Sequence, residues 1–121
     1  MKIAVAQGDG IGPEIMDAVL SIFKANKTPL EYEFVDMGKW VFDKGFSNGM
    51  TPESKVTIEN LGILFKGPME TPKGKGVKSV NVTARKTWNT YANKRVFQTL
   101  HGVDTVFSKG GIPIDITVVR E

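Results

Sequence analysis

The sequence contains no cysteine and only one histidine, His101, among its 121 residues. The lack of cysteine excludes disulfide bonds, thiolate nucleophiles and cysteine-based zinc sites. A single histidine excludes a histidine-rich metal cluster, so a bound metal ion would have to be held by carboxylate oxygens.

The chain also lacks a run of about 18 consecutive apolar residues, the length that a membrane-spanning helix requires. Its N-terminus, MKIAVAQGDG, becomes polar too early for the apolar region of a signal peptide. With 40% hydrophobic and 24% charged residues, the composition is that of one ordinary globular domain. We therefore expect a cytoplasmic protein with no membrane partner, and we find no repeat or linker that would divide it.

Acidic residues are missing from residues 71–103, which contain seven basic residues: Lys73, Lys75, Lys78, Arg85, Lys86, Lys94 and Arg95. The net charge of the whole chain is only +3, so the positive charge is concentrated in this segment. Such a segment indicates an anionic partner, although a solvated basic face without a partner is the alternative. A nucleic acid could use the same charge, but we expect none because the aromatic pattern of an RNA-binding sheet is missing.

The apolar pattern predicts an α/β fold that begins with a strand at residues 2–6. Pro13 and Glu14 are typical of a helix start, and the helix should end near residues 26–28. Its apolar stripe comprises Ile15, Met16, Val19, Leu20, Ile22 and Phe23. Residues 30–35 alternate in the manner of a half-buried strand, which completes a β-α-β unit.

Further elements are predicted along the rest of the chain, whereas residues 38–50 give no clear prediction. Thr51 and Pro52 indicate the start of a short helix, and residues 61–66 indicate a buried strand. A second apolar stripe, made of Val80, Ala84, Trp88 and Tyr91, predicts a helix that begins near Ser79. Two more strands are predicted at residues 95–97 and 114–120, joined by an irregular connection.

A glycine-rich loop follows the first strand in the string VAQGDGIGPEI, residues 5–15. Gly8, Gly10 and Gly12 are spaced G-x-G-x-G, which is one residue short of the dinucleotide fingerprint G-x-G-x-x-G. The string fits either a phosphate-binding loop or a tight turn that leads into a helix. Because the spacing departs from the fingerprint, we favour the turn.

A second candidate site lies at the start of the predicted helix near Ser79. Ser79 and Asn81 place a hydroxyl and an amide where free backbone N–H groups already attract anions, and Arg85 adds a guanidinium one turn later. Arg95 and Arg120 could supply further bidentate contacts to carboxylates. The alternative is an ordinary serine cap followed by exposed arginines.

Several strings, in this order, resemble the isocitrate dehydrogenases of the β-decarboxylating dehydrogenase family. They are GDGIGPE, FKGPMETPKGKG, SVNVTAR, YANKR and ITVVRE, and together they extend over nearly the whole chain. The resemblance implies the isocitrate/isopropylmalate dehydrogenase-like α/β fold, which is not a Rossmann fold, with this chain as the N-terminal part of the large domain. The string S-x-N-x-x-x-R distinguishes isocitrate enzymes, because isopropylmalate enzymes present apolar contacts from that helix.

The resemblance also implies roles for particular residues. Ser79, Asn81, Arg85, Arg95 and Arg120 would bind isocitrate, while Lys66, Glu70 and Thr71 would lie at the nicotinamide cofactor. Ser79 matches a serine that is phosphorylated in some bacterial members, where the added negative charge would repel the substrate. The cofactor would be NADP or NAD, with NADP favoured, together with Mg or Mn, and the full-length enzyme would be a homodimer.

The resemblance further implies that the catalytic tyrosine and lysine and the metal-binding aspartates lie beyond residue 121. We therefore expect this chain to contain substrate contacts but neither catalytic nor metal-ligating residues, to be inactive alone, and to self-associate through uncovered apolar faces. Homoisocitrate or isopropylmalate dehydrogenase is the alternative within the family. A non-enzymatic domain that binds anions or nucleic acid through the basic segment is the alternative outside it.

Overall fold

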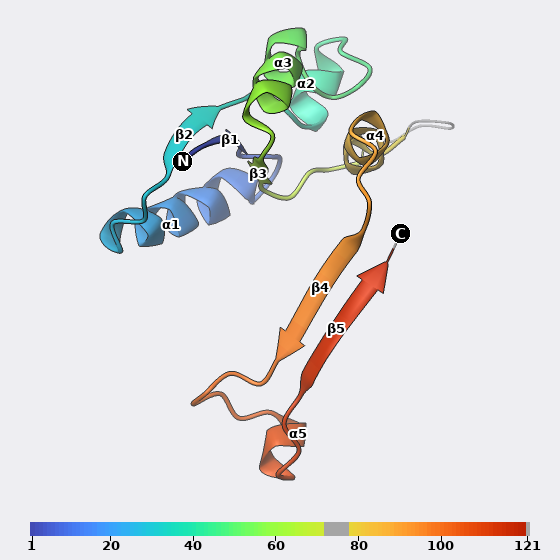
Figure 1. The fold of residues 1–121 in the computed structure, drawn as a ribbon. Helices are drawn as coiled ribbons and strands as arrows, with labels where there is room; N and C mark the ends of the chain where they lie inside the picture. Colours follow the sequence, from blue (N-terminus) through green and yellow to red (C-terminus); the bar gives the residue numbers. More distant parts are fainter. Residues whose placement is uncertain (72–77, 121) are drawn as a thin grey trace. The chain divides into compact units, whose positions relative to one another are not determined.

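The structure is a computed structural model that describes residues 1–71 and 78–120 (Figure 1). The chain forms two compact units, Met1–Thr87 and Trp88–Glu121. Of the seven basic residues in the acid-free segment, Lys73 and Lys75 lie outside the described residues. The other five are divided between the two units.

The first unit is built on a parallel three-stranded sheet with the strand order β2-β1-β3. β1 (Lys2–Ala6) lies in the centre, between β2 (Glu31–Phe34) and β3 (Leu64–Lys66). The first strand and the one at residues 30–35 are confirmed. The third strand is shorter than predicted, because the preceding helix continues to Leu61.

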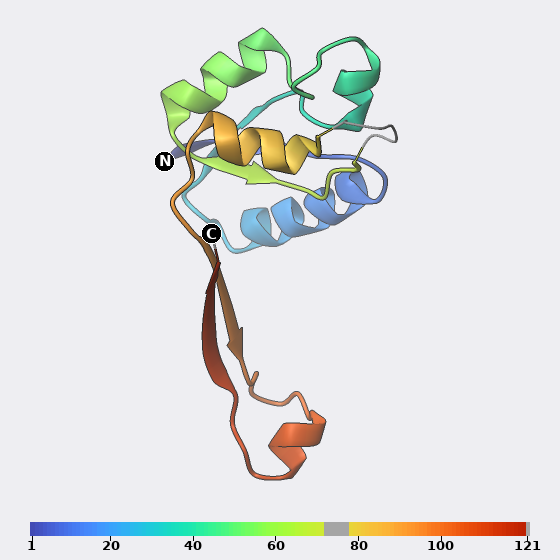
Figure 2. The same ribbon diagram turned by 90° about the vertical axis from the view of Figure 1, so that its right-hand side faces the viewer.

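Helices lie on both sides of this sheet, with α1 (Gly12–Ala25) on one side and α3 (Pro52–Leu61) on the other (Figures 1 and 2). The α1 side contains a hydrophobic core cluster, in which Met16 packs with Ile3 and Val5 of β1. Leu20, Leu30, Tyr32 and Phe65 surround these three residues. The predicted stripe is therefore confirmed through Met16 and Leu20, whereas Ile15 and Ile22 are exposed.

The other helices of the first unit begin after recognisable sequence signals. α3 has Thr51 as its N-cap, and the Thr51 hydroxyl accepts a hydrogen bond from the Ser54 N–H at 3.2 Å, as the sequence predicts. α2 (Lys39–Asp43) lies in the region that gave no clear prediction. α4 (Val80–Thr87) begins directly after Ser79.

The stripe predicted for α4 is only partly correct. Val80 and Ala84 are buried, so they form its packed face. Tyr91 is 97% exposed and follows the end of the helix, so its assignment to this stripe is wrong. The helix ends at Thr87, and an asparagine with positive φ, Asn89, follows in the turn.

The second unit is an antiparallel hairpin of β4 (Asn93–Gln98) and β5 (Asp115–Arg120), which confirms the two predicted strands. A short helix, α5 (Val106–Lys109), lies in the connection between them (Figure 2). No described residue of this unit is buried. In the part of the chain that the structure describes, no helix has the length and apolar character needed to cross a bilayer.

Apolar side chains are consequently exposed along the hairpin. Phe97 and Ile116 are directly opposite each other in the ladder, and they are 52% and 54% exposed. A two-stranded hairpin is at best marginally stable by itself in water. These side chains therefore favour association with another apolar surface.

We predict that the chain self-associates through the face of the hairpin that carries Phe97 and Ile116. Replacing both Phe97 and Ile116 by threonine places a β-branched side chain, which suits a strand, at each position and removes most of the apolar area of these two side chains. Sedimentation velocity over a range of concentrations should show a shift toward the monomer. Lys94→Thr, on the opposite face of β4, is the control and should leave association unchanged; equal association of the double variant would contradict the prediction.

Candidate functional site

The candidate site lies where two neighbouring parallel strands end. β1 and β3 are paired in parallel, so the loops that follow them leave from the same edge of the sheet. This edge is where α/β proteins commonly bind ligands. The glycine-rich loop follows β1, and the loop that carries Glu70 and Thr71 follows β3.

The two loops approach each other so closely that glycine is required on both sides. A Cβ atom at Gly8 would lie 2.1 Å from the Pro68 carbonyl oxygen, and one at Gly67 would lie 2.1 Å from the Gln7 carbonyl oxygen. The Gly67 N–H donates to the Ala6 carbonyl at 2.8 Å, and the Asp9 N–H donates to the Pro68 carbonyl at 2.8 Å. Backbone contact between loops thus accounts for glycine at these two positions, and the predicted turn into a helix is confirmed.

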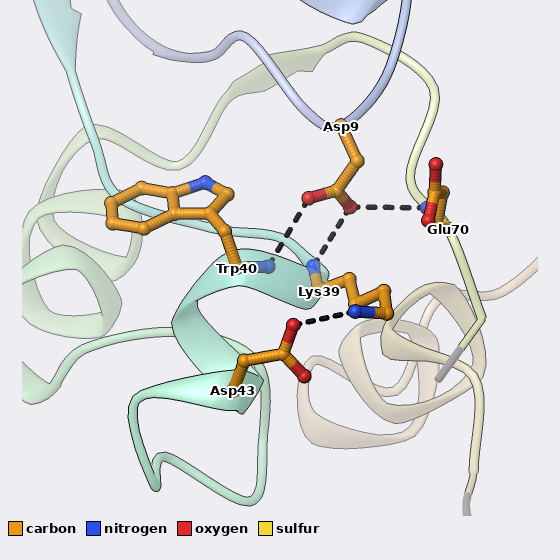
Figure 3. Close-up of polar contacts among 5 residues, drawn as sticks. All are labelled: Asp9, Lys39, Trp40, Asp43 and Glu70. Carbon is orange, nitrogen blue, oxygen red and sulfur yellow. Dashed lines mark hydrogen bonds and ion pairs between the residues drawn. The ribbon is translucent and has the colours of Figure 1, made fainter. Parts of the chain in front are cut away.

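Asp9 is a structural residue of this site that sequence reasoning missed. Its carboxylate accepts three backbone hydrogen bonds, from Lys39 at 2.7 Å, Glu70 at 3.0 Å and Trp40 at 3.2 Å (Figure 3). The acid joins the glycine-rich loop, the start of α2 and the loop after β3. The only sequence signal was an acidic residue between two glycines, which does not indicate partners 30 and 61 residues away.

Lys66 and Arg85 form the positive centre of the site in the first unit. Lys66 ends β3 and is partly buried, and its ammonium group donates to the Gly67 carbonyl at 3.1 Å. Burial lowers the pKa of Lys66 below its usual value of 10.5, and the positive charge of Arg85 lowers it further. The ion pairs between described residues are Lys2–Glu33, Lys39–Asp43 and Lys55–Glu59, so none of them neutralises this pair of cations.

Asn81 is on the same helix as Arg85, four residues earlier, so the two side chains share one face of α4. Its Oδ1 atom is buried and has no hydrogen-bond partner within the described structure. A buried polar atom without a partner is unfavourable, and a ligand that supplies the missing hydrogen bond would remove that penalty. Ser79, at the start of the helix, is partly buried, and its carbonyl accepts the Thr83 N–H at 2.9 Å.

The second unit brings two other candidate residues together. Arg95 pairs with Val118 and Arg120 pairs with Asn93 in the β4–β5 ladder, so both arginines project from the same face near one end of the hairpin. The Arg95 Nε atom donates to the Asn93 side-chain oxygen at 3.4 Å. The hairpin therefore presents two guanidinium groups to one side.

The remaining candidate residues, Glu70 and Thr71, are exposed in the loop after β3. The described residues contain no group of three carboxylate, histidine or cysteine side chains that could hold a metal ion. The site can bind anions through lysine, arginine and amide groups, and its exposed loop can contact a second ligand.

The parallel sheet, with Lys66 at the end of β3 and two loops that meet at one edge, defines an α/β protein with a candidate ligand-binding edge. Residues 2–121 match the sequence profile described as isocitrate/isopropylmalate dehydrogenase. The chain belongs to this family and has its α/β fold. The candidate residues at the sheet edge and on the hairpin all fall within the matched segment.

Individual relatives agree with this assignment. The chain is 44% identical over 119 residues to the NADP isocitrate dehydrogenase of Thermus thermophilus, covering 98% of this chain and 24% of that protein. It is 36% identical to subunit 2 of the mitochondrial NAD isocitrate dehydrogenase of Saccharomyces cerevisiae, covering 98% of this chain and 31% of that protein. The solved isocitrate dehydrogenase of Methylococcus capsulatus superposes with a TM-score of 0.84 at 37% identity, over 99% of this chain and 34% of that one. The chain thus spans a quarter to a third of these relatives.

We predict that the pKa of Lys66 depends on Arg85. In Arg85→Gln the pKa should rise toward 10.5, but only part of the way, because burial is the larger cause of its depression. Titration of the lysine side-chain resonances by NMR measures this shift.

The lowered pKa of Lys66 also makes the folding stability depend on pH. Between the lowered pKa and 10.5 the unfolded chain holds more protons at Lys66 than the folded chain, so folding stability rises with pH across this window. Arg85→Gln should narrow this pH range, because it raises the folded-state pKa of Lys66 toward 10.5. Lys86→Gln, which removes an exposed charge from the same helix, is the control and should leave the pKa of Lys66 unchanged. An unaltered Lys66 pKa in Arg85→Gln would show that Lys66 and Arg85 do not interact.

Proposed function

We propose that this chain provides the substrate-carboxylate contacts of an isocitrate dehydrogenase. The reaction is the oxidative decarboxylation of isocitrate to 2-oxoglutarate, with hydride transfer from the substrate alcohol to a nicotinamide cofactor. The observation that carries the proposal concerns three groups. Within the described residues, no ion pair neutralises Lys66 or Arg85, and the Oδ1 atom of Asn81, on the same helix as Arg85, has no hydrogen-bond partner. The names of the relatives support isocitrate as the substrate class.

The chemistry of these groups suits isocitrate, which carries three carboxylates and a hydroxyl. A guanidinium such as that of Arg85 binds a carboxylate through two parallel hydrogen bonds. The amide of Asn81 and the hydroxyl of Ser79 add neutral hydrogen bonds, and the Asn81 Oδ1 atom can accept only from a donor such as a hydroxyl. Arg95 and Arg120 are proposed to bind further carboxylates from the hairpin.

Lys66, Glu70 and Thr71 are proposed to contact the cofactor. Glu70 and Thr71 are exposed in the loop after β3, and Lys66 ends the strand that leads into it. NADP is favoured over NAD, in line with the Thermus relative, although the yeast relative is named for NAD. A divalent metal bound in the whole enzyme would stabilise the enolate that forms as CO2 leaves.

Two further features belong to the proposal. Ser79 is a candidate phosphorylation site, because a phosphate at the start of α4 would place negative charge beside the proposed carboxylate contacts. The whole enzyme is proposed to be a homodimer in which other parts of the polypeptide supply the catalytic acid and base and the metal ligands. Neither feature is needed for isocitrate binding by Arg85.

The substrate is tested with the whole natural polypeptide that carries this chain. We expect a higher kcat/KM for isocitrate than for isopropylmalate or homoisocitrate, and a loss of about 100-fold for isocitrate in Arg85→Gln, because a carboxylate would lose its charged partner. Lys86→Gln is the control and should stay within about twofold, as expected for an exposed charge. A preference for isopropylmalate would move the assignment to the other branch of the family.

A separate prediction concerns the 121-residue chain by itself. We expect no reduction of NADP or NAD with isocitrate and Mg²⁺ or Mn²⁺, because we propose that other parts of the polypeptide supply the catalytic acid and base and the metal ligands. Absorbance of the reduced cofactor at high protein concentration measures this. Metal-dependent turnover by the purified chain would contradict it.

A further inference from the structure

The Asp9 carboxylate forms the most extensive side-chain contact with backbone groups near the sheet edge, and the proposed substrate contacts do not use it. One oxygen, Oδ2, accepts from the N–H groups of Lys39 and Glu70, and the other, Oδ1, accepts from Trp40 (Figure 3). Three chain segments far apart in sequence thus meet at one side chain. Hydrogen bonds to an ionised acceptor are about twice as strong as neutral ones.

Two of the three bonds fix the start of α2. Lys39 and Trp40 are the first two residues of this helix, and their N–H groups have no partner within it. The preceding residue, Gly38, has no side chain with which to cap the helix. A Cβ atom at Gly38 would lie 2.7 Å from Asp9 Oδ1, so the glycine leaves space for the carboxylate.

The third bond fixes the loop after β3. Near its start the loop is held by two backbone hydrogen bonds, from the Gly67 N–H to the Ala6 carbonyl and from the Asp9 N–H to the Pro68 carbonyl. The Asp9 side chain extends this attachment to Glu70, one residue before Thr71. The Glu70 side chain itself is exposed, so its backbone is held while its carboxylate can face a ligand.

We propose that Asp9 is a positioning residue for the cofactor, acting through the backbone of Glu70. By holding Glu70 against the N-terminus of α2, it sets the place of the loop that meets the nicotinamide end of the cofactor. This inference rests on the proposed function, because the cofactor role of Glu70 and Thr71 is part of that proposal. It does not assign Asp9 any contact with cofactor or substrate.

The arrangement requires both the charge and the length of aspartate. An asparagine offers one acceptor oxygen, and its amide nitrogen would face an N–H donor at the other position. A glutamate keeps two acceptors but moves them by one methylene group. Asp9→Asn therefore weakens the attachment of the loop, and Asp9→Glu keeps the acceptors but displaces the loop or the helix.

The test compares Asp9→Asn and Asp9→Glu with the unaltered protein, using the whole natural polypeptide. We expect the KM and the directly measured Kd for the nicotinamide dinucleotide to rise about tenfold in Asp9→Asn, as for loss of one charge-assisted hydrogen bond. The KM for isocitrate should stay within about twofold, a difference between ligands that general destabilisation would not produce. Asp9→Glu should give a smaller change in the same direction.

Asp43→Asn is the matched control, because Asp43 is an exposed carboxylate on α2 whose partner is the Lys39 side chain rather than the backbone (Figure 3). It should leave the dinucleotide Kd unchanged. Equal rises in the KM for isocitrate and dinucleotide, or no rise in either, would overturn the positioning role. If the protein does not oxidise isocitrate, the proposed function is refuted. The positioning role of Asp9 can still be tested in that case, because the dinucleotide Kd is measured directly.

Amide hydrogen exchange provides a second measurement, and its result in the unaltered protein does not depend on any variant folding. In the unaltered protein the Glu70 amide should exchange more slowly than an unstructured amide, although it lies in an exposed loop, because Asp9 accepts its hydrogen. In Asp9→Asn this protection should fall, while protection in β1 stays. Exchange of the Glu70 amide at the unstructured rate in the unaltered protein would overturn the inference.

Discussion

The close backbone contact between the loops after β1 and β3 is the constraint on which the rest of the site depends. The two strands are hydrogen-bonded in parallel, so their loops emerge together, and Gly8 and Gly67 allow the main chains to touch. This contact fixes the end of β3, and with it the Lys66 ammonium group. It also brings Asp9 within reach of Glu70. The glycine-rich turn therefore positions Lys66 and the loop after β3, although both are distant from it in sequence.

Among the described residues, no ion pair neutralises the two cations of the site, Lys66 and Arg85. Arg85 lowers the pKa of Lys66, which means that each cation makes the other less favourable, and the Asn81 Oδ1 atom adds an unmet hydrogen bond. A protein selected for stability alone would remove such features, since isolated buried polar groups and clustered like charges oppose folding. Groups with perturbed electrostatics are often found at ligand-binding sites. Lys66, Asn81 and Arg85 are among the residues that we propose to contact the substrate or the cofactor.

Much of the fold could be predicted from sequence, because its signals are local. The strand at β1, the proline start of α1 and the threonine cap of α3 each depend on neighbouring residues, and the structure confirms them. α2 was missed because its cap, Asp9, lies 30 residues earlier in the chain. Tyr91 was misassigned because helical spacing cannot show where a helix stops. The candidate residues came from motifs and a family resemblance, but their pairing depends on sheet topology, which no local pattern contains.

The hairpin register has a consequence for the arrangement of charge. Asn93 pairs with Arg120 and Arg95 with Val118, so the two arginines share a face. A slip of one residue would preserve a hydrogen-bonded ladder yet turn one arginine to the opposite side. The pairs that lock the register, Phe97 with Ile116 and Gln98 with Asp115, lie toward the other end of the strands. The pairing at that end of the hairpin thus determines whether the two guanidinium groups lie on one face or on opposite faces.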